Sequence, residues 1–384
     1  MNTRRNIFKP ELLRLESRSV PAVFNFLYSG TSLIVDQIGP ADGTIDFVDD
    51  GTTLTIDDSS TVVSVNVAGI QNITYNLFPA DTDSIDYEQI GFRPGNVTWN
   101  VNNFAFRDFD FDDGTGGIGG DFRITTGNGG LDLEVADEQP VTIGGNFFAQ
   151  FGSVDERIEF GDEADLVTIG GNITLINVND IELETTNIGG SVFASFQGDS
   201  SPTDIDTDSD SFIGGNFTYF GVSGSDELDF DGFIGGNLLV NFQTQAPTGT
   251  DDLNITSTST VAGNLTVMGG NLGTDIVTVA AGATINGNIT LMMGGGTNDV
   301  DLLGLLTGGS ITYLGGSGAD SLTLTPTSGS SSPRIFALMA AGDDVVEIDS
   351  TMATPSFLFI DFGAGSDTFT SMGGAIFPSI IRNL

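Results

Sequence analysis

Ile143-Gly144-Gly145-Asn146-Phe147-Phe148-Ala149-Gln150 is one copy of a phrase that recurs along this chain of 384 residues. The phrase, Ile-Gly-Gly-Asn followed by a short apolar run, returns with variations from Ile118 to Thr307. Its second glycines are Gly120, Gly145, Gly171, Gly190, Gly215, Gly236, Gly263, Gly287 and Gly309. Eight steps cover 189 residues, about 24 residues each. So regular a repeat predicts one stack of equivalent units rather than separate globular domains.

A 24-residue unit without a helical period has the length of one coil of a β-solenoid. We therefore predict an all-β fold, a parallel β-helix whose coils each hold two or three short strands. Stacked coils pair their strands about 4.8 Å apart, so equivalent residues form columns along the rod. The two glycines suit a corner that needs positive φ or a close approach between coils. The asparagine after them is expected to form an amide ladder.

Composition excludes several classes of function. The chain has 11 Lys and Arg against 52 Asp and Glu, a net charge of −41, which argues against binding nucleic acid or an anionic membrane. It has no His and no Cys, so the usual general base, thiolate nucleophiles and zinc knots are absent. No run of 18 apolar residues occurs, so no transmembrane helix is predicted.

The first 22 residues differ from the rest, since they hold five of the eleven basic residues. We predict a basic leader at 1–22 and a single β-solenoid domain at 23–384. Residues 13–22, Leu-Arg-Leu-Glu-Ser-Arg-Ser-Val-Pro-Ala, resemble the LE-x-LE-x-R-x-x-P-A leader of exported planctomycete surface proteins. That resemblance implies export, with an extracellular or cell-surface location. It implies neither a fold nor an activity.

Aspartates follow the same period of about 24 residues. The series is Asp58, Asp83, Asp108, Asp132, Asp155, Asp180, Asp204, Asp226, Asp251, Asp275, Asp299, Asp320, Asp344 and Asp367. In register, these carboxylates would form one column roughly 5 Å apart. Each like-charge pair at that spacing costs on the order of 1 kcal/mol in water. The column is therefore expected either to be fully solvated or to be bridged by cations.

In the C-terminal half the aspartate lies in a glycine-rich frame. Gly315-Gly-Ser-Gly-Ala-Asp320-Ser-Leu-Thr323 resembles the G-G-x-G-x-D-x-U-x nonapeptide of RTX (haemolysin-type) calcium repeats. Degenerate copies precede Asp226, Asp275, Asp344 and Asp367, and a weaker one precedes Asp299. The resemblance implies calcium as the ion, with these six aspartates as its carboxylate ligands.

One departure from that family leaves two alternatives open. RTX nonapeptides run in tandem, whereas here the frame occurs once per coil. A calcium ion would therefore have to bridge neighbouring coils along one edge. The alternative is a Gly-Ser-Asp turn in which the aspartate caps its own backbone, which needs no ion.

These features favour a secreted or cell-surface β-solenoid with a structural or adhesive role and an acidic, calcium-binding edge. Its expected partners are cell-surface polymers or other surface proteins, and no catalytic residues are predicted. A rod that acts only as a spacer is a further alternative.

Carbohydrate-active enzymes on β-helices form a rival class, since they use paired carboxylates or an arginine base. The residues that could serve such an enzyme are Asp110, Asp112, Asp113, Asp208, Asp210, Arg123 and Arg157, with the interrupted stretch 197–211 as the place for a cleft.

Overall fold

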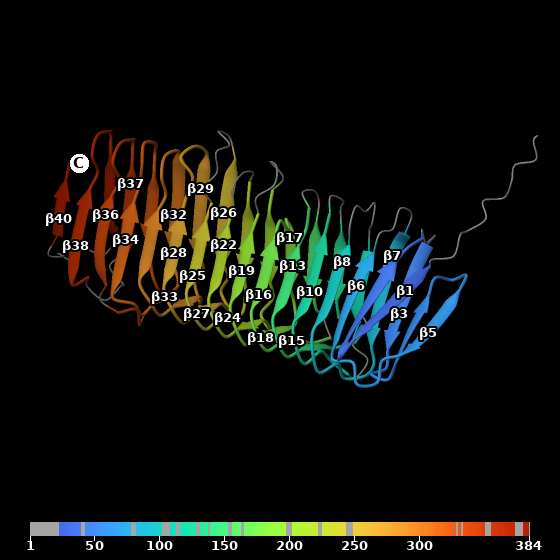
Figure 1. The fold of residues 1–384 in the computed structure, drawn as a ribbon. Coiled ribbons are helices and arrows are strands. Elements are labelled where there is room, and N and C mark those ends of the chain that lie inside the picture. Colours follow the sequence, from blue (N-terminus) through green and yellow to red (C-terminus); the bar gives the residue numbers. More distant parts are fainter. Residues whose placement is uncertain are drawn as a thin grey trace, which may run out of the picture.

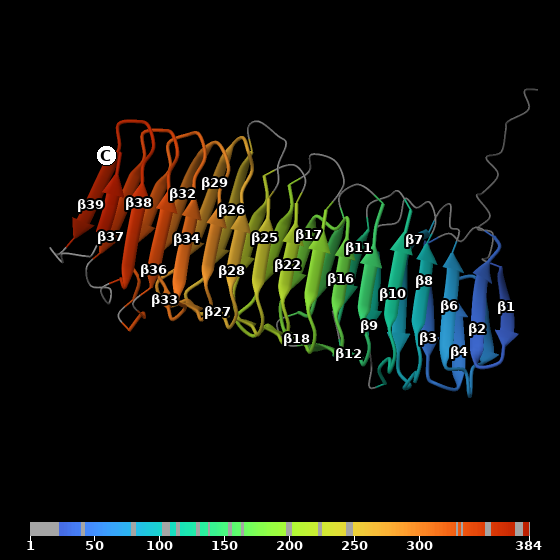
Figure 2. The same cartoon turned by 60° about the vertical axis from the view of Figure 1, so that its left-hand side comes forward.

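The chain folds into an all-β rod, a β-solenoid of about 11 turns whose coils are roughly 24 residues apart, as the repeat predicts (Figure 1). This computed structural model describes residues 23–39, 43–77, 82–101, 108–112, 116–127, 131–136, 139–152, 156–162, 165–196, 202–221, 225–242, 249–327, 329–331, 333–349, 355–372 and 379–383. The expected leader at 1–22 lies outside these residues. Two long sheets run the length of the rod, and a third, narrow sheet follows one edge (Figure 2).

The first sheet has 16 strands. In spatial order they are β1 (Phe24–Ser29), β2 (Ser32–Gln37), β6 (Asn72–Leu77), β8 (Val97–Val101), β10 (Phe122–Thr126), β13 (Phe147–Gln150), β16 (Ile173–Ile176), β19 (Val192–Ser195), β22 (Phe217–Phe220), β25 (Leu238–Asn241), β28 (Leu265–Met268), β31 (Ile289–Met292), β34 (Ser310–Leu314), β36 (Arg334–Leu338), β38 (Phe357–Asp361) and β40 (Ser379–Arg382).

The second sheet also has 16 strands. From the N-terminal end they are β5 (Val62–Asn66), β4 (Thr53–Asp57), β3 (Gly43–Asp49), β7 (Thr82–Gln89), β9 (Asp108–Asp112), β11 (Asp132–Val135), β14 (Arg157–Phe160), β17 (Asp180–Leu183), β20 (Asp204–Thr207), β23 (Glu227–Phe230), β26 (Thr250–Ile255), β29 (Thr274–Val279), β32 (Thr297–Leu302), β35 (Ser321–Leu324), β37 (Val345–Asp349) and β39 (Thr368–Met372).

The third sheet has eight short strands along the corner that precedes the repeated glycines. They are β12 (Val141–Ile143), β15 (Val167–Ile169), β18 (Thr186–Ile188), β21 (Phe212–Ile213), β24 (Phe233–Ile234), β27 (Thr260–Val261), β30 (Thr284–Ile285) and β33 (Leu305–Leu306). One coil thus runs from a first-sheet strand to a second-sheet strand, then to a third-sheet strand and on to the next coil, as in β13, β14, β15 and β16.

Alternation along each strand places one face of every sheet inside the coil. In β13, Phe147 and Ala149 are fully buried while Phe148 and Gln150 face outward. Parallel pairing in register puts Phe147 beside Phe122 of the preceding coil, with the two rings stacked at 5.3 Å. The inward residues therefore form one continuous apolar core along the rod.

The N-terminal end of the rod is built differently. β1 pairs antiparallel with β2, and β3, β4 and β5 form an antiparallel meander. A buried ion pair lies beneath this region, since the Arg93 guanidinium donates to the Asp49 carboxylate and, at 2.6 Å, to the Ile70 carbonyl oxygen. The antiparallel strands end both long sheets at the N-terminal side.

The predicted asparagine ladder is present at the corner after the third sheet. From Asn72 to Asn264 each side-chain oxygen accepts the backbone N–H of the equivalent residue in the next coil, at 2.7–3.0 Å. The Asn288 oxygen accepts the Ser310 hydroxyl instead, at 2.8 Å. We call this the corner ladder; its members are Asn72, Asn96, Asp121, Asn146, Asn172, Ser191, Asn216, Asn237, Asn264 and Asn288. The second glycine of the repeat serves close approach here, since a Cβ on Gly171 would lie 2.6 Å from the Asn146 Oδ1.

Candidate cation-binding ladder

The predicted single column of aspartates is two adjacent columns. Strand pairing places Asp108, Asp132, Asp180 and Asp204 in one column, with Arg157 between Asp132 and Asp180. Asp204 then pairs with Glu227 rather than with Asp226. From Asp226 onward the series, apart from Asp299, therefore lies one position earlier in the strand. Since neighbouring residues of a strand point to opposite faces, the first group faces outward and the second faces inward.

We call the inward column the aspartate ladder. Its members lie at the start of successive second-sheet strands and are Asp226, Asp251, Asp275, Asn298, Asp320, Asp344 and Asp367. The first six are at most 2% exposed, and Asp367 is partly exposed. Five of the six aspartates predicted as metal ligands thus come together. The sixth, Asp299, is exposed on the outward face, and its neighbour Asn298 holds the ladder position.

The earlier coils continue the ladder with residues that the aspartate period missed. Glu156, Asn179 and Thr203 each precede a second-sheet strand by one residue, as Asp226 does. Glu156 and Thr203 are fully buried, and the Asn179 side chain accepts the Glu156 N–H at 2.6 Å. A search for the polar residue one position before each second-sheet strand, rather than for aspartate alone, would have identified these three residues. Asp83 and Asp155 have side chains outside the described residues.

One oxygen joins two coils in five of the ladder carboxylates, namely Asp226, Asp251, Asp320, Asp344 and Asp367. The backbone N–H of Asp320 donates to Asp344 Oδ1 at 2.9 Å, and that of Asp344 donates to Asp367 Oδ1 at 3.0 Å. Asp226 donates in the same way to Asp251 Oδ1 at 3.1 Å. These bonds cap the preceding coil. The alternative of an aspartate that caps its own turn is realised in one of the glycine-rich frames, where Asp275 Oδ2 accepts the Gly270 N–H at 3.0 Å. It is also realised outside the frames at Asp58, which accepts from the Ser60 and Thr61 N–H groups.

The second carboxylate oxygen is what sets this ladder apart. The Oδ2 atoms of Asp226, Asp320, Asp344 and Asp367 are buried and have no hydrogen-bond partner within the described part of the chain. Ion pairs among the described residues involve the guanidinium groups of Arg93 and Arg157, and neither pairs with a ladder residue. The ladder therefore holds a run of carboxylates without a protein counter-charge.

Burial has the expected electrostatic effect on these groups. Desolvation, followed by repulsion from Asp251, raises the pKa of Asp226 to about 7. Desolvation also raises the pKa of Asp275 and of Asp320 to about 6. A buried unpaired carboxylate is costly, so it is relieved either by a proton or by a cation. Carboxylate and carbonyl oxygens are the donors that calcium accepts, at 2.3–2.6 Å in an adaptable shell.

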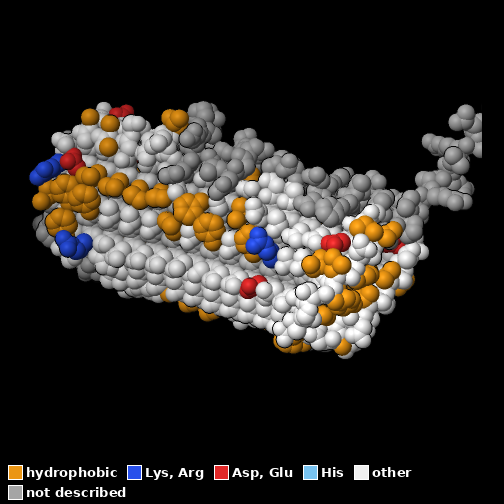
Figure 3. Space-filling model, in the orientation of Figure 1, with side chains coloured by type: hydrophobic (Ala, Val, Ile, Leu, Met, Phe, Trp, Pro, Cys, Tyr) orange, Lys and Arg blue, Asp and Glu red, His pale blue; other side chains and the backbone are white. Residues whose placement is uncertain are grey.

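The outward face of the second sheet carries its own acidic column. Eight successive strands place a carboxylate at the same position: Asp46, Asp86, Asp110, Glu134, Glu159, Glu182, Asp206 and Asp229. Partial desolvation and the neighbouring charges of Asp86 and Glu134 raise the pKa of Asp110 to about 7. Acidic side chains are few on the face drawn in Figure 3, where apolar side chains line the rod.

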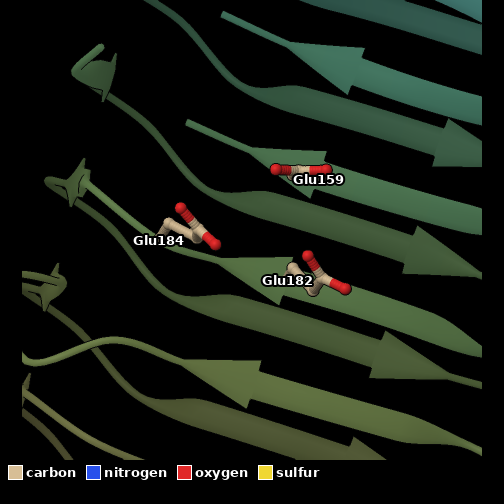
Figure 4. A group of neighbouring side chains, drawn as sticks. All are labelled: Glu159, Glu182 and Glu184. Carbon is tan, nitrogen blue, oxygen red and sulfur yellow. The ribbon is translucent and has the colours of Figure 1, made fainter. Parts of the chain in front are cut away.

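Three carboxylates of the outward face lie within 4.8 Å of one another, namely Glu159, Glu182 and Glu184 (Figure 4). Arg157 already neutralises two of them, with ion pairs of 2.5 Å to Glu159 and 2.8 Å to Glu182. A shallow hollow of about 380 Å³ adjoins them, lined by residues 182–184 and 206–208. The group is therefore an ion-pair network on an open surface.

The residues of the enzyme alternative do not converge on one place. Asp110 and Asp112 share the outward face of β9, whereas Asp208 and Asp210 are exposed at the end of β20. Arg123 lies over the Phe148 ring at 4.2 Å, and Arg157 belongs to the network just described. Asp113 and residues 197–201 of the interrupted stretch lie outside the described residues.

Comparison with known proteins adds no relative. No protein-family profile matches the chain, and neither a curated protein nor a solved structure is significantly similar to it. Within its described residues the chain has no helix long and apolar enough to cross a membrane.

Proposed function

We propose that the chain is a secreted or cell-surface structural or adhesive rod whose coils are locked together by calcium bound along the aspartate ladder. The observation that carries this proposal is the run Asp320, Asp344 and Asp367. Three successive coils there hold a carboxylate with one oxygen bonded to the preceding coil and the other without a partner.

The chemistry of the run supports a cation. Neighbouring coils are about 4.8 Å apart, so one ion between two coils is within reach of both carboxylates. Such an ion would neutralise charges that otherwise repel each other in a poorly solvated interior. Because each ion would contact two coils, binding would stabilise the stack itself. The oxygen-only donor set favours a hard cation, and an adaptable shell favours calcium over magnesium.

A structural role is proposed over a catalytic one because the polar groups repeat. The outward and inward carboxylates each recur in register over many coils. An enzyme site instead requires a few non-equivalent groups at one place. Export and surface location rest on the leader resemblance at residues 13–22.

The test is thermal unfolding of the full chain, followed by circular dichroism, in EDTA, in millimolar calcium and in millimolar magnesium. We expect calcium to raise the melting temperature by several degrees and magnesium to raise it less. An unchanged melting temperature and spectrum in calcium and EDTA would refute the proposal. Turnover of an anionic glycan such as pectin or alginate by the chain would favour the enzyme class instead.

A further inference from the structure

The outward face of the first sheet changes character along the rod. At β6 and β8 it is polar, since the Asn100 amide donates to Asn76 Oδ1 at 2.8 Å. From β13 to β40 every strand adds at least one apolar side chain to it, and Figure 3 shows this stretch as a band with arginine side chains at both ends. We call it the apolar band; its members, all at least partly exposed, are Phe148, Ile176, Phe193, Phe220, Leu239, Met268, Met292, Leu314, Phe336, Leu338, Phe357, Phe359 and Ile380.

The band is continuous because the sheet is in register. Strand pairing aligns one column over four successive coils, made of Met268, Met292, Leu314 and Leu338. Phe336, in the neighbouring outward column, is 37% exposed. Single exposed apolar residues are ordinary on a protein surface, whereas a contiguous run of them marks an interaction site. The band therefore has the form of a docking surface.

The same face lacks the negative charge found elsewhere on the rod. First-sheet strands from β8 to β36 contain no Asp or Glu, whereas every second-sheet strand from β9 to β26 has an outward carboxylate. The first-sheet face carries three arginines, each with its guanidinium 4.2–5.6 Å from the centre of a phenylalanine ring: Arg123, Arg334 and Arg382. Aromatic residues, Met and Arg are enriched at protein–protein interfaces, where Asp, Glu and Lys are depleted. The composition of the face is thus that of an interface between proteins.

Charge favours a second copy of this chain as the occupant. A chain with a net charge of −41 repels its own copies wherever two acidic faces meet. Two copies that meet through the apolar band keep their acidic second sheets on opposite sides of the pair. A polyanion or an anionic membrane is repelled by the rest of the rod, and a polycation finds no acidic run on this face.

The band is also large enough for a stable pair. It spans eleven strands, from β13 to β40. At about 4.8 Å between strands and about 13 Å for four residues of a strand, the face measures roughly 50 by 13 Å. Two such faces in contact bury about 1,300 Å² in total, within the range of about 1,200–2,000 Å² for specific interfaces.

We propose that the apolar band is the interface of a symmetric dimer, in which two rods pack first sheet against first sheet. Such an interface uses the same surface on both copies, so it closes at two chains. β28 is the middle strand of the eleven, and it therefore lies opposite its own copy whether the two rods run in the same direction or in opposite directions. The pairing goes beyond the proposed function and requires no calcium.

Sedimentation equilibrium of the full chain at micromolar concentrations tests the pairing. The test variant combines Met268→Glu with Met292→Glu, which places two carboxylates near the middle of the band. The matched control combines Asn254→Glu with Thr278→Glu, which adds the same charge at adjacent, partly exposed positions on the outward face of the second sheet. Circular dichroism verifies that both variants are folded.

Cross-linking locates the contact independently, because the chain has no cysteine of its own. Thr266→Cys lies on the outward face of β28, and Thr278→Cys lies on the outward face of β29 in the same coil. Sheets that pack face to face are about 10 Å apart, so a thiol cross-linker of about that reach should join two copies of Thr266→Cys. It should leave Thr278→Cys unlinked.

We expect the natural chain and the control to sediment as dimers, equally in EDTA and in calcium. The methionine variant should dissociate with a Kd at least about 100-fold higher, because like charges then face each other across the interface. A dimer that survives in this variant, or that is lost equally in the control, would overturn the inference. A monomeric natural chain would also overturn it, and binding of a polysaccharide or a lipid vesicle by that monomer would assign the band to that partner instead. These outcomes are independent of the melting-temperature response to calcium, which tests the proposed function.

Discussion

The corner ladder and the aspartate ladder use the same hydrogen bond in two environments. In each, a side-chain Oδ1 accepts a backbone N–H from an adjacent coil, at 2.8 Å for Asn172 and 2.9 Å for Asp344. The corner ladder is exposed and mostly neutral, whereas the aspartate ladder is buried and mostly charged. Stacking therefore needs an acceptor at both places, but it needs a negative charge at neither.

Each ladder contains one residue of the other kind. Asp121 stands in the corner ladder, where its Oδ1 accepts from the Asn146 N–H at 2.7 Å. Asn298 stands in the aspartate ladder and is 1% exposed. Asparagine thus fits the buried column, and the five buried aspartates there carry a charge that stacking does not require. That surplus charge, placed where it is most costly, is the reason to propose a bound cation.

The largest expected effect comes from the close approach in the corner ladder. In Gly171→Ala the new Cβ would lie 2.6 Å from both Asn146 Oδ1 and the Gly145 carbonyl oxygen. Since backbone cannot move away cheaply, we expect a loss of about 2–4 kcal/mol in the free energy of unfolding. Denaturant titration measures it. The control is Gly309→Ala, the same corner position with its nearest contact at 3.8 Å, which should change little.

Removing charge from the aspartate ladder should stabilise the rod when calcium is absent. Asp344→Asn keeps the Oδ1 that accepts the Asp320 N–H and removes a fully buried charge. We expect a gain of about 1–3 kcal/mol in EDTA, together with a smaller response to calcium. Asp344→Ala, which loses the acceptor as well, is the contrasting variant. Equal destabilisation by both substitutions would contradict the account.

The outward acidic column predicts a pH effect. The pKa of Asp110 is about 7 and that of Asp206 about 6, both above the ordinary value of 3.8, so the folded rod binds these protons more tightly than the unfolded chain does. The stabilisation that these two carboxyl groups contribute in their protonated form is fully present below pH 4, and it is lost as the pH rises toward 7. Asp110→Asn should therefore gain about 1 kcal/mol at pH 7.5, after allowance for solvent screening, and nothing at pH 4. Urea titrations at the two pH values decide it.

The smallest effect is expected for a charge added to the exposed ladder. Asn237→Asp keeps the oxygen that accepts the Asn264 N–H at 2.8 Å, and it loses only the exposed amide bond that Asn237 donates to Asn216 Oδ1 at 3.1 Å. Since the site is exposed, we expect a change within about 0.5 kcal/mol. A loss as large as the gain in Asp344→Asn would show that burial is not what distinguishes the two ladders.

The sequence predicted the coil and the corner because both depend on a strict repeat. Ile-Gly-Gly-Asn marks one corner in every coil, and the Asn146 and Asn172 bonds follow from stacking alone. The aspartate column was predicted less well. Its spacing varies by a few residues between coils, and a shift of one residue turns a side chain from the interior to the surface. Asp299 and Asn298 differ by that one step, which only strand pairing fixes.

The most direct test of the central claim compares the natural chain with the variant Asp226→Asn, Asp320→Asn, Asp344→Asn and Asp367→Asn combined. Both are unfolded with denaturant in EDTA and in calcium. The account predicts that calcium at 100 times its dissociation constant stabilises the natural chain by about 2.7 kcal/mol per site. The combined variant should be more stable than the natural chain in EDTA and indifferent to calcium. An equal gain from calcium in both proteins would contradict the claim that the aspartate ladder is where the ions bind.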